Sequence, residues 1–224
     1  MVILFILICS IILPLFLAAL MIKNNKRNIK PILLGALTFI FFQLVLRIPL
    51  LQLVLPGTMW YTKLTLNPWS YALFLGLTAA IFEEVGSYVV IRLFMKKNLN
   101  PKSGLCFGIG HGGIEAILLV GINVIIALIL SLPMGSSYEL ALGGIERLIA
   151  ISFHIGMSIM IVKAVQTKKV FWLIIPILLH TITDMLAVIA VYYNYKLYQI
   201  ELMLLPFAIF ALAFSWRELR NERK

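Results

Sequence analysis

The histidines and carboxylates of this chain lie inside apolar segments long enough to cross a bilayer. The segment "GIGHGGIEAILLVGINVIIALIL" carries His111 and Glu115, and the segment "LLHTITDML" carries His180 and Asp184. A spacing of four places both members of each pair on one face of a helix. A charged group at the centre of a bilayer costs about 3 kcal/mol on insertion scales, so such groups usually face a polar interior and mark function.

Two more apolar segments carry the other members of this set. "AIFEEVGSY" places Glu83 and Glu84 near the middle of its segment, and "GGIERLIAISFHIGMS" contains Glu146, Arg147 and His154. Arg147 and His154 are seven positions apart and share a helical face. All three histidines of the chain therefore lie within apolar segments, each with a carboxylate in the same segment.

Taken one at a time, these groups have structural interpretations. Glu115 with His111, or Glu146 with Arg147, could form a buried ion pair that helps to lock the helices together, and Asp184 could cap a kink. Taken together, carboxylates and histidines at similar depth on four helices imply a shared polar site. We expect that site to be functional.

A divalent metal such as zinc suits this set of side chains. Zinc in enzymes is held by histidine nitrogens and carboxylate oxygens with one position open for water, and a nearby glutamate can take a proton from that water. HxxxD supplies two ligands from one helical face, as HExxH supplies two histidines. We predict His154, His180 and Asp184 as ligands, with Glu84 or its neighbour Glu83 as general base. The residues expected to orient these ligands, or to replace one of them, are His111, Glu115, Glu146 and Arg147.

The composition places the chain in a bilayer. Of 224 residues, 62% are hydrophobic and 12% charged, and the mean hydropathy is +1.04, whereas about half of the residues in a soluble domain are apolar. The formal charge of +10 comes from basic clusters between apolar segments, where they set orientation, so we expect no nucleic-acid partner. Hydrophilic stretches have only connector length, which predicts one membrane-embedded domain over 1–224.

The predicted fold is all-α, a polytopic transmembrane bundle of seven helices. Segments of about 20 apolar residues span the bilayer core, and open sheet edges are not viable in lipid. The expected spans are 1–22, 31–55, 69–95, 105–132, 140–166, 170–192 and 199–216. The basic connectors, such as "KNNKRNIK" and "KKNLNPKSG", lie on one side, which predicts a cytoplasmic C-terminus and an outside N-terminus.

Four glycines, Gly108, Gly110, Gly112 and Gly113, surround His111. Small residues permit close helix approach in membranes, and we favour this interpretation. A locally opened helix that admits an extended peptide is the alternative.

The order of these motifs resembles the YhfC family of membrane peptidases. The resemblance covers roughly residues 69–192 and consists of EE in one span, GxGHGGxEA in the next, ER with a histidine seven positions after the arginine, and then HxxxD. That family is related to the CPBP intramembrane metalloproteases (CAAX-prenyl and bacteriocin-processing enzymes), to PrsW and more distantly to the APH-1 subunit of γ-secretase. The resemblance implies that the helices within residues 69–192 form the catalytic core.

The resemblance implies a glutamate-dependent, metal-assisted proteolysis within a bacterial plasma membrane, on a membrane-associated peptide or protein. Glu83 and Glu84 would match the diglutamate of EExxxR, and His180 with Asp184 the HxxxN/D motif. His154 would match the histidine of the middle motif, for which His111 in "FGIGH" competes.

The chain departs from the family pattern at one position. EExxxR requires an arginine at position 88, where this chain has Tyr88, and Arg92 follows one turn later.

We expect a polar cavity formed by spans three to six in which a metal-activated water hydrolyses a peptide bond. The first alternative is a scaffold or immunity-type protein that binds a partner in the same cavity, as APH-1 is a scaffold in its complex. A proton-coupled transporter with a relay of glutamate, histidine and aspartate is the second alternative.

Overall fold

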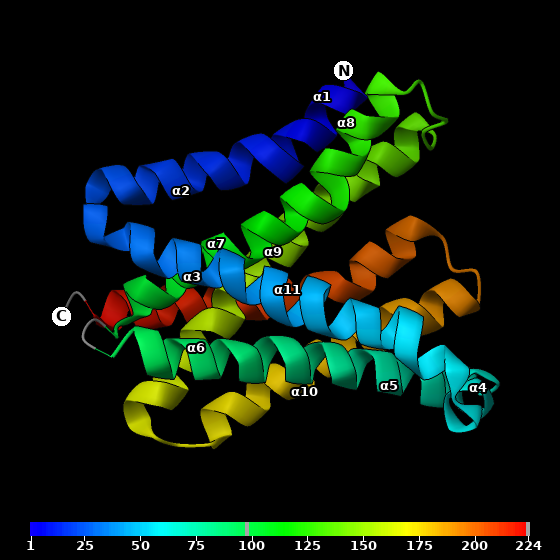
Figure 1. The fold of residues 1–224 in the computed structure, drawn as a ribbon. Helices are drawn as coiled ribbons and strands as arrows, with labels where there is room; N and C mark the ends of the chain where they lie inside the picture. Colours follow the sequence, from blue (N-terminus) through cyan, green and yellow to red (C-terminus); the bar gives the residue numbers. More distant parts are fainter. Residues whose placement is uncertain (97–98, 223–224) are drawn as a thin grey trace.

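The computed structural model describes residues 1–96 and 99–222, and these residues form a bundle of helices without a strand (Figure 1). Within this described part, seven helical spans are long and apolar enough to cross a membrane, which confirms the predicted number. The spans are Val2–Asn24, Lys26–Gly57, Pro68–Phe94, Pro101–Ile129, Ser137–Thr167, Phe171–Tyr192 and Leu197–Asn221.

Several spans consist of more than one helix. The first contains α1 (Val2–Leu7) and α2 (Leu13–Asn24), the second contains α3 (Ile29–Phe39), and the short α4 (Met59–Thr65) precedes the third. The third contains α5 (Pro68–Ala80) and α6 (Gly86–Phe94), and the fourth α7 (Pro101–Ala116) and α8 (Ile122–Ile129). The last three are α9 (Ser137–Thr167), α10 (Phe171–Tyr192) and α11 (Leu197–Asn221).

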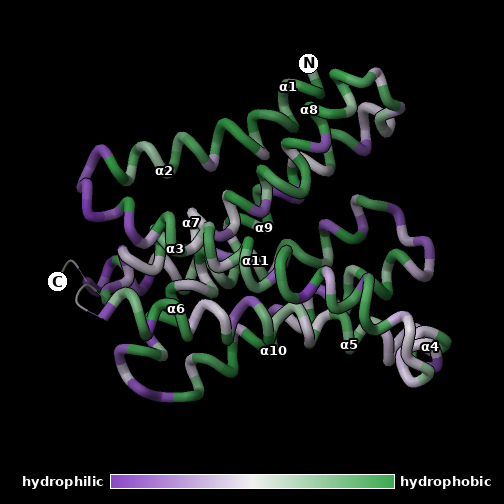
Figure 2. The backbone as a smooth tube through the Cα atoms, viewed as in Figure 1, coloured by the Kyte–Doolittle hydropathy of each residue, from purple (hydrophilic) through white to green (hydrophobic). Residues whose placement is uncertain are grey.

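The outside of the bundle is hydrophobic along its length. Figure 2 shows hydrophobic residues along the spans and hydrophilic residues at the connections, for example at the turn from α2 to α3. Large apolar side chains such as Phe16, Leu37 and Ile209 are exposed on the outer surface. This surface suits contact with lipid chains, so the hydrophobic effect does not explain how the spans adhere to one another.

Glycines allow the central helices to approach closely. α7 packs against α3 and α9. A Cβ atom added at Gly110 would collide with the carbonyl oxygen of Ile32 in α3, and one added at Gly108 would lie 2.5 Å from Cα of Ile155 in α9. The glycines around His111 therefore serve close packing, which is the favoured of the two sequence interpretations.

Capping side chains define where α7 and α9 begin. Asn100 accepts a hydrogen bond from the backbone N–H of Ser103, whose hydroxyl in turn accepts one from the backbone N–H of Asn100. Ser136 and Glu139 form the same reciprocal pair at the start of α9. Such boxes satisfy N–H groups that have no partner within the helix. They fix the starting points of the two helices that carry His111 and His154.

Several spans are interrupted by π-helical turns. Two of them matter for the site: Ile81–Val85 joins α5 to α6, and Ile40–Arg47 follows α3. π-helical turns inside α-helices are uncommon and occur frequently at functional positions. In this chain one of them contains the adjacent glutamates Glu83 and Glu84.

Candidate metal centre and active site

Glu83 and His111 form the first contact of the site. Glu83 lies in the π-helical turn of the third span, and its Oε2 is 3.0 Å from Nε2 of His111 in α7. Both side chains are buried. The ring of Phe39 in α3 packs edge-on against His111, with 5.4 Å between ring centroids. His111 is thus held from two neighbouring spans.

His154 of α9 pairs with Glu115 of α7. Nε2 of His154 lies 2.7 Å from Oε2 of Glu115, and the other oxygen of Glu115 accepts a hydrogen bond of 3.0 Å from Arg147. Arg147 also donates to the carboxylate of its neighbour Glu146. This chain of charged groups holds the Glu115 carboxylate in one orientation beside His154, the kind of supporting contact that tunes metal sites.

His180 forms a third group with two carboxylates. Its Nδ1 lies 2.7 Å from Oε1 of Glu84, and its Nε2 lies 3.7 Å from Oδ1 of Asp184, one helical turn later. α10 packs against α5, and Gly76 of α5 permits this contact, because a Cβ there would lie 2.5 Å from the carbonyl oxygen of Thr181.

Four of these side chains can converge on a single ion. Glu83, His111, Glu115 and His154 each offer one ligand atom, and these atoms lie within 4.8 Å of one another. The ligand set predicted from spacing was His154, His180 and Asp184. The structure places His154 in this group, together with both residues expected in supporting positions on α7, His111 and Glu115.

His180 and Asp184 lie beside the four-residue group. The rings of His154 and His180 meet edge to face, with 5.6 Å between their centroids. The i, i+4 spacing correctly places His180 and Asp184 on one face. It does not reveal which partner that face meets, and His180 directs one nitrogen to Glu84.

The two candidates for the middle-motif histidine are close together. The rings of His111 and His154 are 4.8 Å apart between centroids. Both can therefore contribute to one site.

A cavity of about 150 Å³ opens onto these groups. Its lining includes polar residues of the third to sixth spans, as expected, and also residues of the second and seventh spans that the motifs did not indicate. These additional residues are Phe39, Gln43 and Leu204.

Arg47 is a further buried charge near the site. It donates hydrogen bonds to Gln43 (3.2 Å), to Thr78 (3.3 Å) and to the carbonyl oxygen of Leu75 (2.7 Å), and it lies close enough to Glu83 and Asp184 to interact electrostatically. The motif spacing missed it. Its signal in the sequence is a single arginine within the apolar stretch "FFQLVLRIPL".

Comparison with known proteins agrees with these motifs. The family model described as YhfC intramembrane metalloprotease matches residues 9–136 and 131–207. The chain is also 31% identical over 207 residues to the uncharacterized membrane protein YhfC of Bacillus subtilis (strain 168), and 80% of each chain is covered. The chain belongs to the YhfC family. It is a multi-pass membrane protein, because its seven spans have the length and composition needed to cross a membrane and its relative is a membrane protein. No solved structure matches it.

The family description implies a metal, and the buried side chains fit one. Two histidine nitrogens and two carboxylate oxygens are ligands that zinc accepts. Nδ1 of His111 is buried and has no hydrogen-bond partner in the described part of the chain. A histidine that serves only packing usually has both polar atoms satisfied, so His111 fits a ligand better than a packing residue.

A bound cation is one of two ways to balance the charges of the site in this member of the YhfC family, and protonation of its histidines is the other. The site has five carboxylates, Glu83, Glu84, Glu115, Glu146 and Asp184, and two guanidinium groups, Arg47 and Arg147. Three negative charges remain when the histidines are neutral, and none remains when all three histidines are protonated. Isolated charges in a low-dielectric interior are strongly unfavourable, so they are paired, neutralised by protons or bound to metal.

The arginine of the diglutamate motif is absent from the site. Tyr88 occupies its position, and Arg92 lies at the surface, where it donates a hydrogen bond of 3.4 Å to the hydroxyl of Tyr88. The buried arginine that interacts electrostatically with Glu83 in this YhfC protein is Arg47, which comes from the second span.

Proposed function

We propose that this chain is a metal-dependent intramembrane peptidase that hydrolyses a peptide bond of a membrane-associated peptide or protein, in a bacterial plasma membrane. The observation that carries the proposal is the convergence of Glu83, His111, Glu115 and His154 from three spans within 4.8 Å. The membership of the YhfC family supports the same reaction class.

In this proposal, His111, His154 and Glu115 hold a divalent metal, and Glu83 is the base. Three protein ligands with one open position are the pattern of catalytic zinc sites, and His₂Glu is a known set. The metal would supply a Lewis acid for a peptide carbonyl and would acidify water. Glu83 is placed to accept a proton at Oε2, the atom that now faces Nε2 of His111.

His180 serves as a second proton-carrying group beside the cavity. Glu84 binds its Nδ1, which fixes the orientation of the ring and leaves Nε2 toward Asp184 and the cavity. A base held by a third group in this way is common in hydrolases. We assign His180 to transfer of a proton to the leaving amine, with Glu84 and Asp184 as its orienting partners.

The size and the lining of the cavity restrict which substrate segment can enter it. At about 150 Å³ it accommodates a short piece of extended peptide rather than a folded chain. Gln43 lines the cavity and its amide oxygen accepts a hydrogen bond from Arg47, so in this proposal its amide N–H groups hydrogen-bond to a peptide backbone.

The test is cleavage by purified protein in liposomes supplied with zinc and a mixture of synthetic single-span peptides, with products identified by mass spectrometry. Wild-type protein should generate new peptide ends, and the Glu83→Gln variant should not, because removal of a general base typically lowers the rate by about 100-fold or more. Wild-type protein that binds zinc but produces no new ends from any peptide would favour the scaffold alternative.

A further inference from the structure

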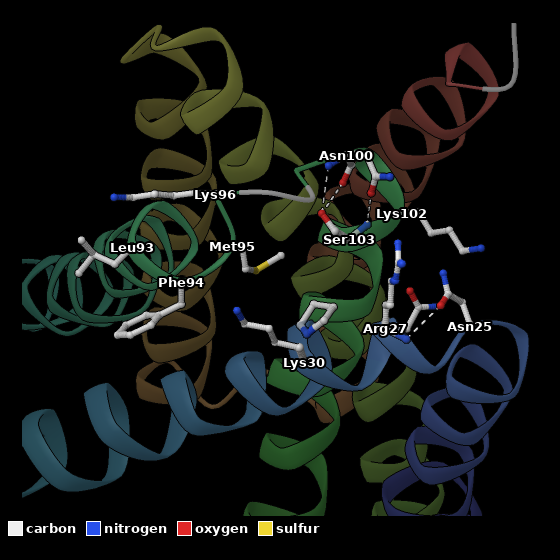
Figure 3. Close-up of a pocket in the computed structure, with 12 residues that line it drawn as sticks. Asn25, Arg27, Lys30, Leu93, Phe94, Met95, Lys96, Asn100, Lys102 and Ser103 are labelled. Atoms are coloured by element: carbon white, nitrogen blue, oxygen red, sulfur yellow. Dashed lines mark hydrogen bonds between the residues drawn. The ribbon is translucent and has the colours of Figure 1, made fainter.

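A second and larger cavity lies at the end of the bundle where α2 turns into α3 and α6 connects to α7. Its volume is about 560 Å³. Figure 3 shows Arg27, Lys30 and Lys102 on the side of α3 and α7, and Phe94 and Met95 on the side of α6. None of the residues that line it belongs to the metal centre or to its cavity.

The charge of this cavity is one-sided. Four cationic side chains line it, Arg27, Lys30, Lys96 and Lys102, and none of its described lining residues is acidic. They come from two connectors that are far apart in the sequence. The orientation of the protein in the membrane accounts for basic connectors on one side of the bilayer. It does not account for basic residues of two connectors lining the same cavity. Four like charges at one cavity favour an anionic occupant.

The backbone around the cavity is held by side-chain hydrogen bonds. Asn28 is buried and donates to the carbonyl oxygen of Met21 with a distance of 2.8 Å, which ties the turn to the end of α2. Asn25 accepts from the backbone N–H of Arg27, and Asn100 and Ser103 cap α7. The N-terminal ends of α3 and α7 lie here, so their dipoles add to the positive potential.

One wall of the cavity is apolar. It consists of Pro31, Leu93, Phe94 and Met95, of which Leu93 and Phe94 are each 55% exposed. The cavity lies at helix ends, the level at which a membrane protein meets the lipid headgroups. A cationic side and an apolar side at this depth match the two parts of a phospholipid, whereas a free phosphate would use the cations alone.

We propose that this cavity binds an anionic phospholipid, with its phosphate group on the cationic side that Arg27, Lys30 and Lys102 line and its glycerol and upper acyl chain against Phe94. Basic pockets between membrane helices are a known means of binding lipid headgroups. The proposal is independent of the proteolytic function, because it uses none of the site's residues.

Native mass spectrometry of the full-length protein in detergent tests the proposal, with phosphatidylglycerol as probe and phosphatidylcholine as comparison. The cavity variant replaces Arg27, Lys30, Lys96 and Lys102 by glutamine. The control variant replaces four exposed basic residues at the same end of the bundle by glutamine, Lys168, Lys169, Arg217 and Arg220. Each cation near an anionic headgroup strengthens binding by about fivefold. We expect the cavity variant to bind phosphatidylglycerol at least about tenfold more weakly than the control variant.

Three results would overturn the proposal. Equal loss of phosphatidylglycerol in both variants would show a general effect of surface charge. Equal binding of phosphatidylcholine by the wild type would show that the anionic headgroup is not recognised. Displacement of phosphatidylglycerol by millimolar inorganic phosphate would identify a free phosphate as the occupant. If the fourfold variant does not fold, Lys30→Gln and Lys102→Gln singly should each weaken binding by about fivefold, and unchanged binding in both would contradict the proposal.

Discussion

Glu83 and Glu84 are adjacent in the chain, but they hydrogen-bond to histidines of two different spans. Glu83 contacts His111 of α7 at 3.0 Å, and Glu84 contacts His180 of α10 at 2.7 Å. Both carboxylates are buried, 3% exposed each. The π-helical turn that contains them is wider than an α-helical turn, so consecutive side chains are separated by a smaller angle and both can face the interior. The two glutamates therefore have separable roles.

The first prediction separates the metal ligands from the neighbouring His180. Elemental analysis of protein purified without chelator and supplied with zinc should find near-stoichiometric metal in the wild type and in His180→Ala. His111→Ala and His154→Ala should each lose it, because each removes a nitrogen of the four-residue group. If His180→Ala loses the metal and His111→Ala keeps it, the ligands are instead the spacing-derived set of His154, His180 and Asp184.

The second prediction concerns Arg147, which lies between two carboxylates. Replacement by methionine keeps the bulk of the side chain but leaves Glu115 and Glu146 without their cation. Breaking a buried ion pair in this way typically costs about 3 to 5 kcal/mol. The free energy of unfolding, measured by denaturant titration in mixed micelles, should fall by this order.

Lys163→Met is a matched control for Arg147→Met. It breaks a pair with Glu218 in which the cation is more accessible, because the Lys163 side chain is 24% exposed and that of Arg147 9%, and it leaves one carboxylate unpaired rather than two, so its effect should be smaller. Addition of Glu146→Gln to Arg147→Met should recover part of the stability, since one unpaired carboxylate is then removed. An Arg147→Met variant as stable as the wild type would show that the network does not hold α7 to α9.

The third prediction concerns the contact of α3 with α7. Gly110→Ala places a methyl group against the backbone of Ile32, which can move away only if the helix moves. Overpacking of this kind costs about 1 to 3 kcal/mol, and separation of the two helices would shift His111, the next residue. We expect a lower melting temperature and weaker zinc binding, measured by competition with a chromophoric chelator.

Gly57→Ala provides the comparison for Gly110→Ala. No atom lies within 4 Å of a Cβ added at Gly57, so this variant should match the wild type in both measurements. Normal zinc affinity in Gly110→Ala would show that the glycine contact does not set the position of His111.

The spans and their polar residues follow from the sequence, because both depend on local information. Hydropathy over about 20 residues defines a span, and an ionisable residue within one is conspicuous. The predicted limits of 199–216 are short for the last span, Leu197–Asn221. Its helix continues past Trp216 into charged residues, where hydropathy falls although the backbone hydrogen bonds continue.

The pairing of site residues does not follow from the sequence. The spacing of four between His111 and Glu115 suggested, as one structural interpretation, that these two residues pair with each other. In the structure His111 pairs with Glu83 and Glu115 with His154. Which residue a helical face meets depends on helix rotation and packing, and a π-helical turn shifts that rotation without a recognisable motif.

The last prediction tests whether Arg47 replaces the arginine missing at Tyr88. Arg47 is buried and connects the second span to the third through Thr78 and the carbonyl oxygen of Leu75. Arg47→Gln removes a charge from beside the carboxylates and breaks these hydrogen bonds, which are worth about 1.5 to 3 kcal/mol when one partner is charged. The free energy of unfolding should therefore fall by at least that much.

Arg92→Gln is the control, because Arg92 is the arginine nearest to the motif position and is exposed. Surface changes of this kind usually alter stability by no more than about 0.5 kcal/mol. Peptide cleavage should follow the same order as stability. Arg47→Gln should cleave more slowly than the wild type and Arg92→Gln at the wild-type rate, because Arg47 interacts with Glu83 and Asp184 whereas Arg92 contacts Tyr88 at the surface. If Arg92→Gln is the impaired variant, Arg92, on the same span as Glu83 and Glu84, takes the place of the motif arginine, and Arg47 serves helix packing alone.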